Sequence, residues 1–171
     1  MMRQLTLIST FSFALTSGLA MAQDAAPARA PELALALEAA QAALAACAQN
    51  GVKASASIVD AKGGHKVLLA ADGVRGSSVE VSIKKAYTAS VMKTSTADLV
   101  ERMKTDKALE AKITADKALW ARPGGFPFMV GNEVIGAIGV AGAQALNGVA
   151  GGERDAVCAK AGHEKISARL K

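Results

Sequence analysis

Few residues of this sequence have the types and spacing that catalysis or metal binding requires. His65 and His163 are its two histidines, too few for a local cluster of histidine metal ligands. The chain contains no G-x-S-x-G motif, which marks the nucleophilic serine of α/β-hydrolases. Asp60, Asp72 and Glu133 all fall at predicted turns, where such residues mainly form the turn and contact water. The sequence therefore shows no evident catalytic site.

Glycines recur through residues 121–142, ARPGGFPFMVGNEVIGAIGVAG. Gly136, Gly139 and Gly142 follow a G-x-x-G-x-x-G spacing inside a predicted strand, whereas a dinucleotide-binding motif lies between a strand and a helix. Glycine within a strand instead permits the close approach of another backbone, a helix or a flat ligand. The segment thus predicts close packing or ligand stacking rather than phosphate binding.

Hydrophobic periodicity and turn residues define the elements that must position these groups. We expect a helix over 32–50, a hairpin with strands at 52–60 and 65–71, short helices between 96 and 120, a second hairpin with strands at 126–130 and 134–140, and a final helix over 153–170. Two hairpins separated by helices predict an α/β protein with a mostly antiparallel sheet flanked by helices.

A further helix is predicted to begin after Ser77, because Ser77 and Glu80 have the spacing of a capping box. Ser95 and Asp98 form a second, weaker box. The buried face of the first of these helices is predicted from its apolar positions and comprises Val79, Ile83, Ala86, Tyr87 and Ser90.

The two cysteines, Cys47 and Cys158, lie on the apolar faces of the first and last predicted helices. Helices that flank one sheet can bring two such thiols together, and we favour a disulfide between them. The alternative is two separate buried thiols.

The N-terminus has the pattern of a cleaved secretory signal. Arg3 precedes a short apolar stretch, and Ala20-Met21-Ala22 fits the small-x-small cleavage site. We therefore expect a signal peptide over residues 1–22, a linker over 23–31, a single domain over 32–171, and a periplasmic or secreted protein. The apolar stretch is too short and too interrupted for a membrane span.

Charge and composition disfavour nucleic acid as a partner. The net charge of +5 is mild, the basic residues are scattered, and aromatic residues make up only 4% of the chain. A nucleic-acid-binding surface usually needs a basic stripe or aromatic platforms for the bases.

Four segments together resemble a known family: SIVDAKGGHKVLLAADG, SIKKAYTAS, RPGGFPFMVGNEVIGAIGVAGA and DAVCAKAGHEKI. In this order they are similar to the GlcG-like, HbpS-like heme-binding family, which includes the C-terminal domain of PduO-type corrinoid adenosyltransferases. The resemblance runs from Leu33 to Leu170 and implies a profilin-like fold, frequent homo-oligomers, and binding of heme or its iron. His163 departs from the family, which usually has an apolar residue there.

The resemblance also directs attention to particular ligands. His65 matches the family's GGH and is the first candidate for the heme iron, against the alternative of an exposed histidine at a strand start. Lys84 and Arg122 are candidates for the heme propionates, or are simply solvated. Tyr87 is a further candidate whose leading interpretation is core packing. Gly124 and Gly125 form the turn that leads into the second hairpin. They are the last two candidate heme-binding residues.

We therefore expect an exported, non-catalytic binding protein for heme or a related flat acidic ligand, with a role in sensing or sequestration. The alternative is an enzyme, or an enzyme accessory, that acts on a small organic acid.

Overall fold

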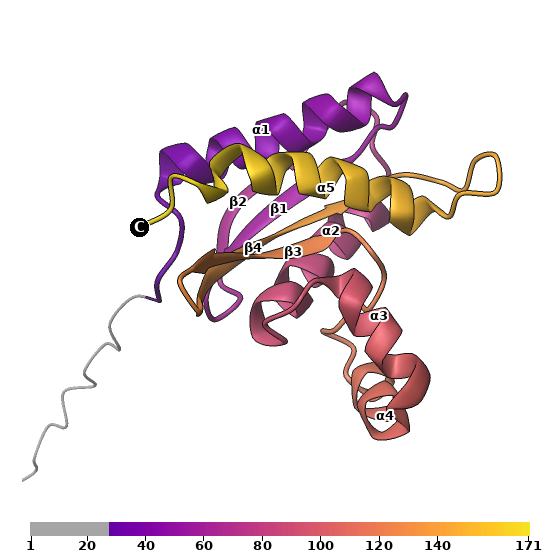
Figure 1. Cartoon of the computed structure of the whole chain (residues 1–171). Helices are drawn as coiled ribbons and strands as arrows, with labels where there is room; N and C mark the ends of the chain where they lie inside the picture. The colour runs from indigo at the N-terminus through magenta and orange to yellow at the C-terminus, as the bar shows by residue number, and fades with distance from the viewer. Residues whose placement is uncertain (1–27) are drawn as a thin grey trace, which may run out of the picture.

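The computed structural model describes residues 28–171 as nine helices and strands (Figure 1). In chain order these are α1 (Leu33–Gln49), β1 (Ser55–Asp60), β2 (His65–Ala70), α2 (Gly76–Val91), α3 (Thr96–Thr105), α4 (Lys107–Ala115), β3 (Gly125–Val130), β4 (Glu133–Ala141) and α5 (Gly151–Ser167). The predicted signal peptide and the first part of the predicted linker, residues 1–27, lie outside the described residues.

The strands form one antiparallel sheet in the order β2-β1-β4-β3. Helices α1 and α5 cover one face of the sheet, and α2 covers the other, with α3 and α4 beyond it (Figure 1). The central strands β1 and β4 are buried along most of their length because both of their faces are covered. The predicted α/β fold, a mostly antiparallel sheet flanked by helices, is confirmed.

Small side chains let α1 and α5 pack closely together. Ala39 and Ala43 are fully buried, and a side chain at Gly162 would collide with the Ala39 carbonyl oxygen. A disulfide joins Cys47 of α1 to Cys158 of α5, with a Cα–Cα distance of 5.2 Å. The structure thus agrees with the favoured disulfide rather than with two separate thiols.

Gly139 explains much of the glycine-rich segment. It lies in the central strand β4, and a Cβ atom there would come within 2.3 Å of both the Ser82 carbonyl oxygen and the Ala86 amide nitrogen. Glycine at this position therefore allows the backbone of α2 to lie directly against the sheet. Close packing is what the structure shows at Gly139.

Helix α2 differs from its prediction at its start and on its buried face. It begins at Gly76, with Arg75 as N-cap and no side-chain cap, so the capping box at Ser77 is wrong. The side chains turned fully inward are small or polar: Ser78, Ser82, Lys85, Ala86, Thr88, Ala89 and Ser90. By contrast, the second capping box is confirmed, because Ser95 Oγ accepts a hydrogen bond from the Asp98 amide at 3.1 Å.

The described part of the predicted linker forms no helix or strand but packs on the domain. Pro31 is buried, and the Ala61 amide donates to the Arg29 carbonyl at 2.9 Å. The Arg29 side chain pairs with Glu133 at the start of β4. Residues 28–31 therefore fasten the entry to α1 against the turns at one end of the sheet.

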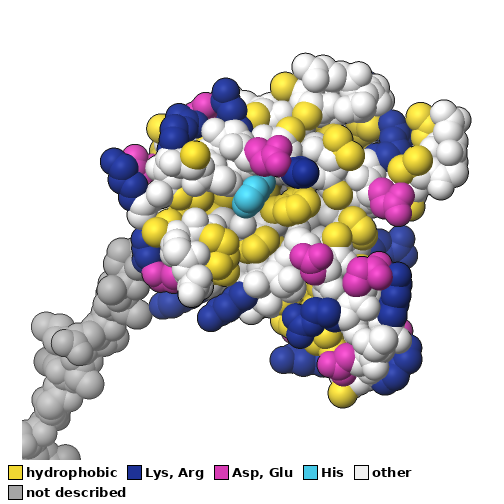
Figure 2. All heavy atoms as spheres, in the orientation of Figure 1, with side chains coloured by type: hydrophobic (Ala, Val, Ile, Leu, Met, Phe, Trp, Pro, Cys, Tyr) yellow, Lys and Arg dark blue, Asp and Glu magenta, His cyan; other side chains and the backbone are white. Residues whose placement is uncertain are grey.

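Basic and acidic side chains are interspersed on the surface shown in Figure 2, including around α3 and α4. Over residues 28–171, no helix combines the length and apolar character needed to cross a bilayer.

Candidate functional site

Trp120 is the centre of a cationic and aromatic cluster on the α2 side of the sheet. Lys84 Nζ lies 5.8 Å from the centroid of the Trp120 ring, and Arg122 Cζ lies 5.9 Å from it. The Trp120 amide donates to Thr88 Oγ1 of α2 at 2.8 Å, which fixes the backbone beneath the indole. Cations over an aromatic face are attracted by the ring quadrupole. The structure thus brings together Lys84 and Arg122, two of the sequence-predicted ligands.

A mainly apolar pocket of about 490 Å³ adjoins this cluster; we call it the Trp120 pocket. Its walls include Met103, Ile113 and Leu119, together with Lys84 and Arg122. Ile113 and Leu119 belong to a small buried cluster against which Tyr87 also packs. The Trp120 pocket therefore combines an apolar wall with three basic side chains, of Lys84, Lys117 and Arg122, and one acidic side chain, of Asp116.

Tyr87 connects this cluster to the β1–β2 turn. A Cβ atom at Gly63, whose φ is +86°, would lie 2.3 Å from Tyr87 Cδ2, so the ring packs directly on the glycine. Asp60 Oδ1 stabilises the same turn by accepting hydrogen bonds from the amides of Lys62 and Gly64, each at 2.8 Å. Tyr87 is half-buried in this packing. Its role as a ligand stays a prediction.

His65 follows this turn as the first residue of the edge strand β2. Its side chain is exposed, and it pairs across the sheet with Val59. It does not line the Trp120 pocket, whose described walls come from α2, α3, α4 and the segment before β3. The predicted iron ligand therefore does not line the pocket that the two predicted propionate ligands line.

Gly124 and Gly125 make room for Lys85 of α2. A Cβ atom at Gly124 would come within 2.8 Å of Lys85 Nζ, and one at Gly125 within 2.6 Å of the Lys85 carbonyl oxygen. The Gly125 amide also donates to Thr96 Oγ1 at 2.9 Å. These glycines seat a buried lysine, and their predicted part in heme binding stays a prediction.

Lys85 forms a buried ion pair with Asp155 of α5, which the sequence analysis did not find. Lys85 Nζ lies 2.7 Å from Asp155 Oδ2 and donates to the Val140 carbonyl at 2.9 Å. The Ala143 amide donates to Asp155 Oδ1 at 2.8 Å. Burial lowers the pKa of the Lys85 ammonium and raises the pKa of the Asp155 carboxyl, while their mutual attraction opposes both shifts.

A sequence signal for Lys85 does exist. Ser78, Ser82, Lys85 and Ala89 lie on one face of α2, spaced three or four residues apart. Small residues on one face of a helix allow that face to pack closely on a sheet. A lysine on the same face is then predicted to be buried. Its acidic partner, 70 residues away, has no such local signal.

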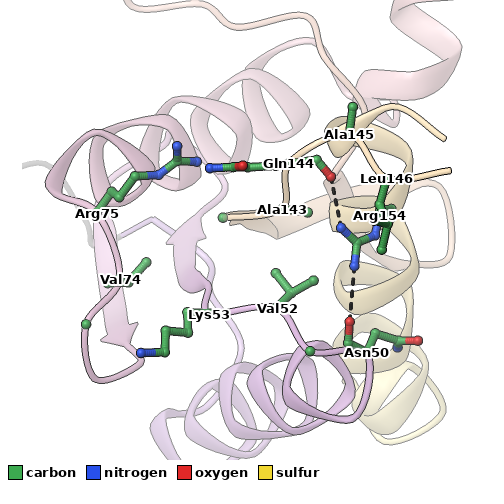
Figure 3. A pocket seen from close by; sticks show the side chains of 13 residues that line it. Asn50, Val52, Lys53, Val74, Arg75, Ala143, Gln144, Ala145, Leu146 and Arg154 are labelled. Carbon is green, nitrogen blue, oxygen red and sulfur yellow. Dashed lines mark hydrogen bonds between the residues drawn. The ribbon is translucent and has the colours of Figure 1, made fainter. Parts of the chain in front are cut away.

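Figure 3 shows a second pocket, of about 500 Å³, which we call the Arg154 pocket. Arg154 donates to the carbonyl oxygens of Gln144 at 2.9 Å and Asn50 at 3.1 Å, joining the β4–α5 segment to the end of α1. Lys53 and Arg75 line the opposite side, and Arg75 extends toward Gln144 (Figure 3). Within residues 28–171, no group of three or more His, Cys, Asp or Glu residues is arranged to hold a metal ion.

The fold and the Trp120 pocket define a class: an α/β domain whose antiparallel four-stranded sheet lies between helical layers, with a pocket that contains basic side chains on its α2 side. The family model described as "Haem degrading protein HbpS-like" matches residues 32–164. The chain belongs to this HbpS-like family, as its sequence motifs indicated.

Individual relatives agree with this assignment. A 15.0 kDa protein encoded in the dhaT–dhaS intergenic region of Citrobacter freundii is 30% identical over 111 residues, which are 64% of this chain and 78% of the relative. The structure of a double mutant of Streptomyces reticuli HbpS is 26% identical, with a TM-score of 0.69 over 91% of this chain and 97% of that chain. The structure of PduOC in complex with heme is 24% identical, with a TM-score of 0.69 over 83% of this chain and 97% of that chain, and shows the same fold.

Proposed function

We propose that this protein is an exported, non-catalytic binding protein for heme or a related flat acidic ligand, and that ligand capture supports sensing or sequestration. The observation that carries the proposal is Trp120, with Lys84 and Arg122 both over its ring, on the wall of a mainly apolar pocket. Membership of the HbpS-like family and the heme bound by the PduOC relative support the same ligand.

The chemistry of the Trp120 pocket fits heme. A porphyrin is flat and apolar, so it gains from contact with an aromatic ring and with aliphatic side chains such as Ile113. Its two propionates are anionic, and Lys84 and Arg122 supply two positive charges beside the same wall. In this arrangement the cations orient the ligand, while the apolar wall excludes water from it.

The iron requires a ligand of its own, and the structure offers two candidates. His65 is the ligand that the sequence motif predicts, but it does not line the Trp120 pocket, so it ligates the iron only if the bound heme extends beyond that pocket toward the β1–β2 turn. Met103 lines the Trp120 pocket itself, and a thioether is a known heme ligand. Heme would supply the iron and the macrocycle, whereas these side chains would only hold them.

Export and self-association complete the proposal. The Cys47–Cys158 disulfide supports an oxidising compartment, where such bonds persist. The segment between β4 and α5 projects from the domain (Figure 1) and exposes Leu146 and Val149, which supports contact with another copy of the chain. Loss of residues 1–22 in the mass of the secreted protein tests export, and light scattering tests the oligomer.

Titration of the purified protein with hemin tests the binding function. We expect a shifted Soret band that saturates at one equivalent and then persists. Unsaturable adsorption would refute specific binding. A band that forms and then bleaches in the presence of a reductant and oxygen would instead show degradation of heme, the activity named in the family description.

A further inference from the structure

A third pocket, of about 430 Å³, lies between the first turns of α2 and α5; we call it the α2–α5 hollow. It shares Arg75 with the Arg154 pocket on one side, and Trp120 and Arg122 with the Trp120 pocket on the other. The Arg154 and Trp120 pockets have no lining residue in common. The hollow therefore lies between them and has a guanidinium group toward each end.

The side-chain charges that line the hollow are positive on balance. Asp155 is the acidic residue of its lining, and the ion pair with Lys85 at 2.7 Å compensates it. Arg75 and Arg122 form no ion pair with any described residue between 28 and 171. An anion that enters the hollow thus meets two guanidinium groups whose charge no protein carboxylate balances.

Two helix N-termini open into the same hollow. Ser77 and Ser78 come from the first turn of α2, and Gly151 and Gly152 from the first turn of α5. Neither helix has a side-chain cap. The first amides of a helix lack partners within the helix and carry partial positive charge, so both ends add to the attraction for an anion.

The hydroxyl group of Ser78 is an independent sign of a ligand. Ser78 is only 6% exposed and lines the hollow. Its Oγ atom has no hydrogen-bond partner among the described residues, in contrast with Ser82 one turn later, which bonds to the Val79 carbonyl at 2.7 Å. Ser78 Oγ is not among the fully buried side-chain atoms that lack a partner in the described residues, which are Ser57 Oγ and Trp120 Nε1, so it is open to the hollow. A ligand oxygen in the hollow can therefore bond to this hydroxyl without displacing a protein partner.

The remaining walls are aliphatic and suit a carbon skeleton. Val81, Ala141, Ala145 and Ala150 line the hollow between its charged ends. A free inorganic anion leaves these side chains without a contact. A short carbon chain with an acidic group at each end satisfies both the guanidinium groups and the aliphatic walls.

We propose that the α2–α5 hollow binds a small organic acid with two carboxylates, one held by Arg75 with Ser78 and the other by Arg122. This site is distinct from the heme site proposed above, although the two pockets share Trp120 and Arg122. The ligand is recognised by charge at two ends and by an apolar middle of a few carbons.

Isothermal titration of the whole mature protein with succinate and glutarate tests the proposal, with acetate and inorganic phosphate as comparison ligands. We expect saturable binding of a dicarboxylate at one per chain and binding of acetate at least tenfold weaker. Arg75→Gln weakens dicarboxylate binding at least tenfold. Ser78→Ala weakens it about threefold or more and leaves the melting temperature of the free protein unchanged, because its hydroxyl has no protein partner to lose. The matched control is Lys66→Gln, which removes a charge from the exposed edge strand β2 and leaves binding unchanged.

Three results would overturn the assignment: no saturable heat with either dicarboxylate, the same affinity in Arg75→Gln as in the parent protein, or binding of inorganic phosphate alone. Hemin titrations of the same variants separate this site from the heme site. Arg75→Gln leaves hemin binding unchanged, whereas Lys84→Gln weakens hemin binding and leaves succinate binding unchanged.

Discussion

Lys85 of α2 and Asp155 of α5 form a buried ion pair at the end of the central strand β4, with Nζ and Oδ2 2.7 Å apart and side chains only 2% and 6% exposed. The two helices lie on opposite faces of the sheet (Figure 1), so this pair joins the two helical layers. It also fixes the end of β4, because Lys85 bonds to the Val140 carbonyl and Asp155 bonds to the Ala143 amide. The pair thus forms a polar link beside the α2–α5 hollow.

Removal of one partner of this pair should be strongly destabilising. Lys85→Met leaves the Asp155 carboxylate buried without its cation, and we expect a loss of about 3–5 kcal/mol in the free energy of unfolding. Chemical denaturation measures the loss. The double variant Lys85→Met/Asp155→Asn, in which both charges are absent, should lose less than the sum of the two single variants; additive losses would show that the pair is not coupled.

His163 should make stability depend on pH. Its ring stacks on Phe128 with centroids 5.5 Å apart, its Nε2 lies 3.0 Å from the Pro127 carbonyl, and burial lowers the pKa of the imidazole below 6.5. The unfolded chain then binds a proton at a higher pH than the folded protein does. This contribution to stability is present above pH 6.5 and is lost as the pH falls through the folded pKa.

Denaturation curves between pH 7.5 and 5 measure the His163 effect, with His163→Phe as the control. The parent protein should lose more stability over this range than the variant does. Equal losses would assign the pH dependence to other groups.

The disulfide should contribute substantially to stability. Cys47 and Cys158 are 111 residues apart in the chain, and closure of a loop of this length contributes about 5 kcal/mol by chain entropy. Reductant should therefore shift the denaturation midpoint of the parent protein and leave that of Cys47→Ala/Cys158→Ala unchanged. Thiol labelling of the denatured, unreduced protein should find no free cysteine; labelling at either position would contradict the bond.

Substitution of His65 should change the heme spectrum as well as the affinity. If His65 is the iron ligand, His65→Ala shifts the Soret band and weakens hemin binding about tenfold or more, where each decade is ~1.4 kcal/mol. Lys84→Ala should weaken binding less and leave the band in place, because it changes a charge contact and not the iron. An unchanged spectrum and affinity in His65→Ala would exclude His65 and make Met103 the next residue to test.

The fold was predictable because periodicity and turn residues determine it locally. Glycines after α1, between β1 and β2 and between β3 and β4 mark turns, and Gly139 in a strand correctly indicated a close approach to its neighbour. Cys47 and Cys158 could be paired because each lies on the apolar side of its own helix. In each of these cases the relevant signal lies within a few residues of the position concerned.

The buried face of α2 was predicted only in part: Ala86 and Ser90 are buried as expected, but the large apolar residues Val79, Ile83 and Tyr87 are not fully buried. Ile83 and Tyr87 form the more apolar side of the helix, but both are only half-buried, and Tyr87 packs against the cluster that contains Leu99 and Ile113. The sheet surface beneath α2 includes Ser55 and Gly139, which match the small residues of the helix. The side of α2 that faces the sheet is determined by the shape of that sheet surface. The helical periodicity of the α2 sequence carries no information about that surface.

The candidate site was predictable only in part, because its residues meet through tertiary packing. Lys84 and Arg122 were identified from motifs, and both lie over the Trp120 ring. Trp120 itself was not selected as a candidate ligand. Its position depends on the packing of α3 and α4, which only the tertiary structure determines. The α2–α5 hollow likewise depends on Arg75 and Ser78 meeting the start of α5.

The most direct test of the heme-binding function is the titration of Trp120 variants with hemin, followed at the Soret band. Trp120→Ala removes the aromatic wall and the platform for Lys84 and Arg122, so we expect binding at least tenfold weaker than in the parent protein. Trp120→Phe keeps an aromatic ring and removes an indole N–H that meets no acceptor among the described residues, so it should retain most of the affinity without loss of stability. Saturable binding at one equivalent in the parent protein and in Trp120→Phe, with weak binding in Trp120→Ala, is the expected result. Equal hemin affinity in all three proteins would contradict the assignment of the Trp120 pocket as the heme site.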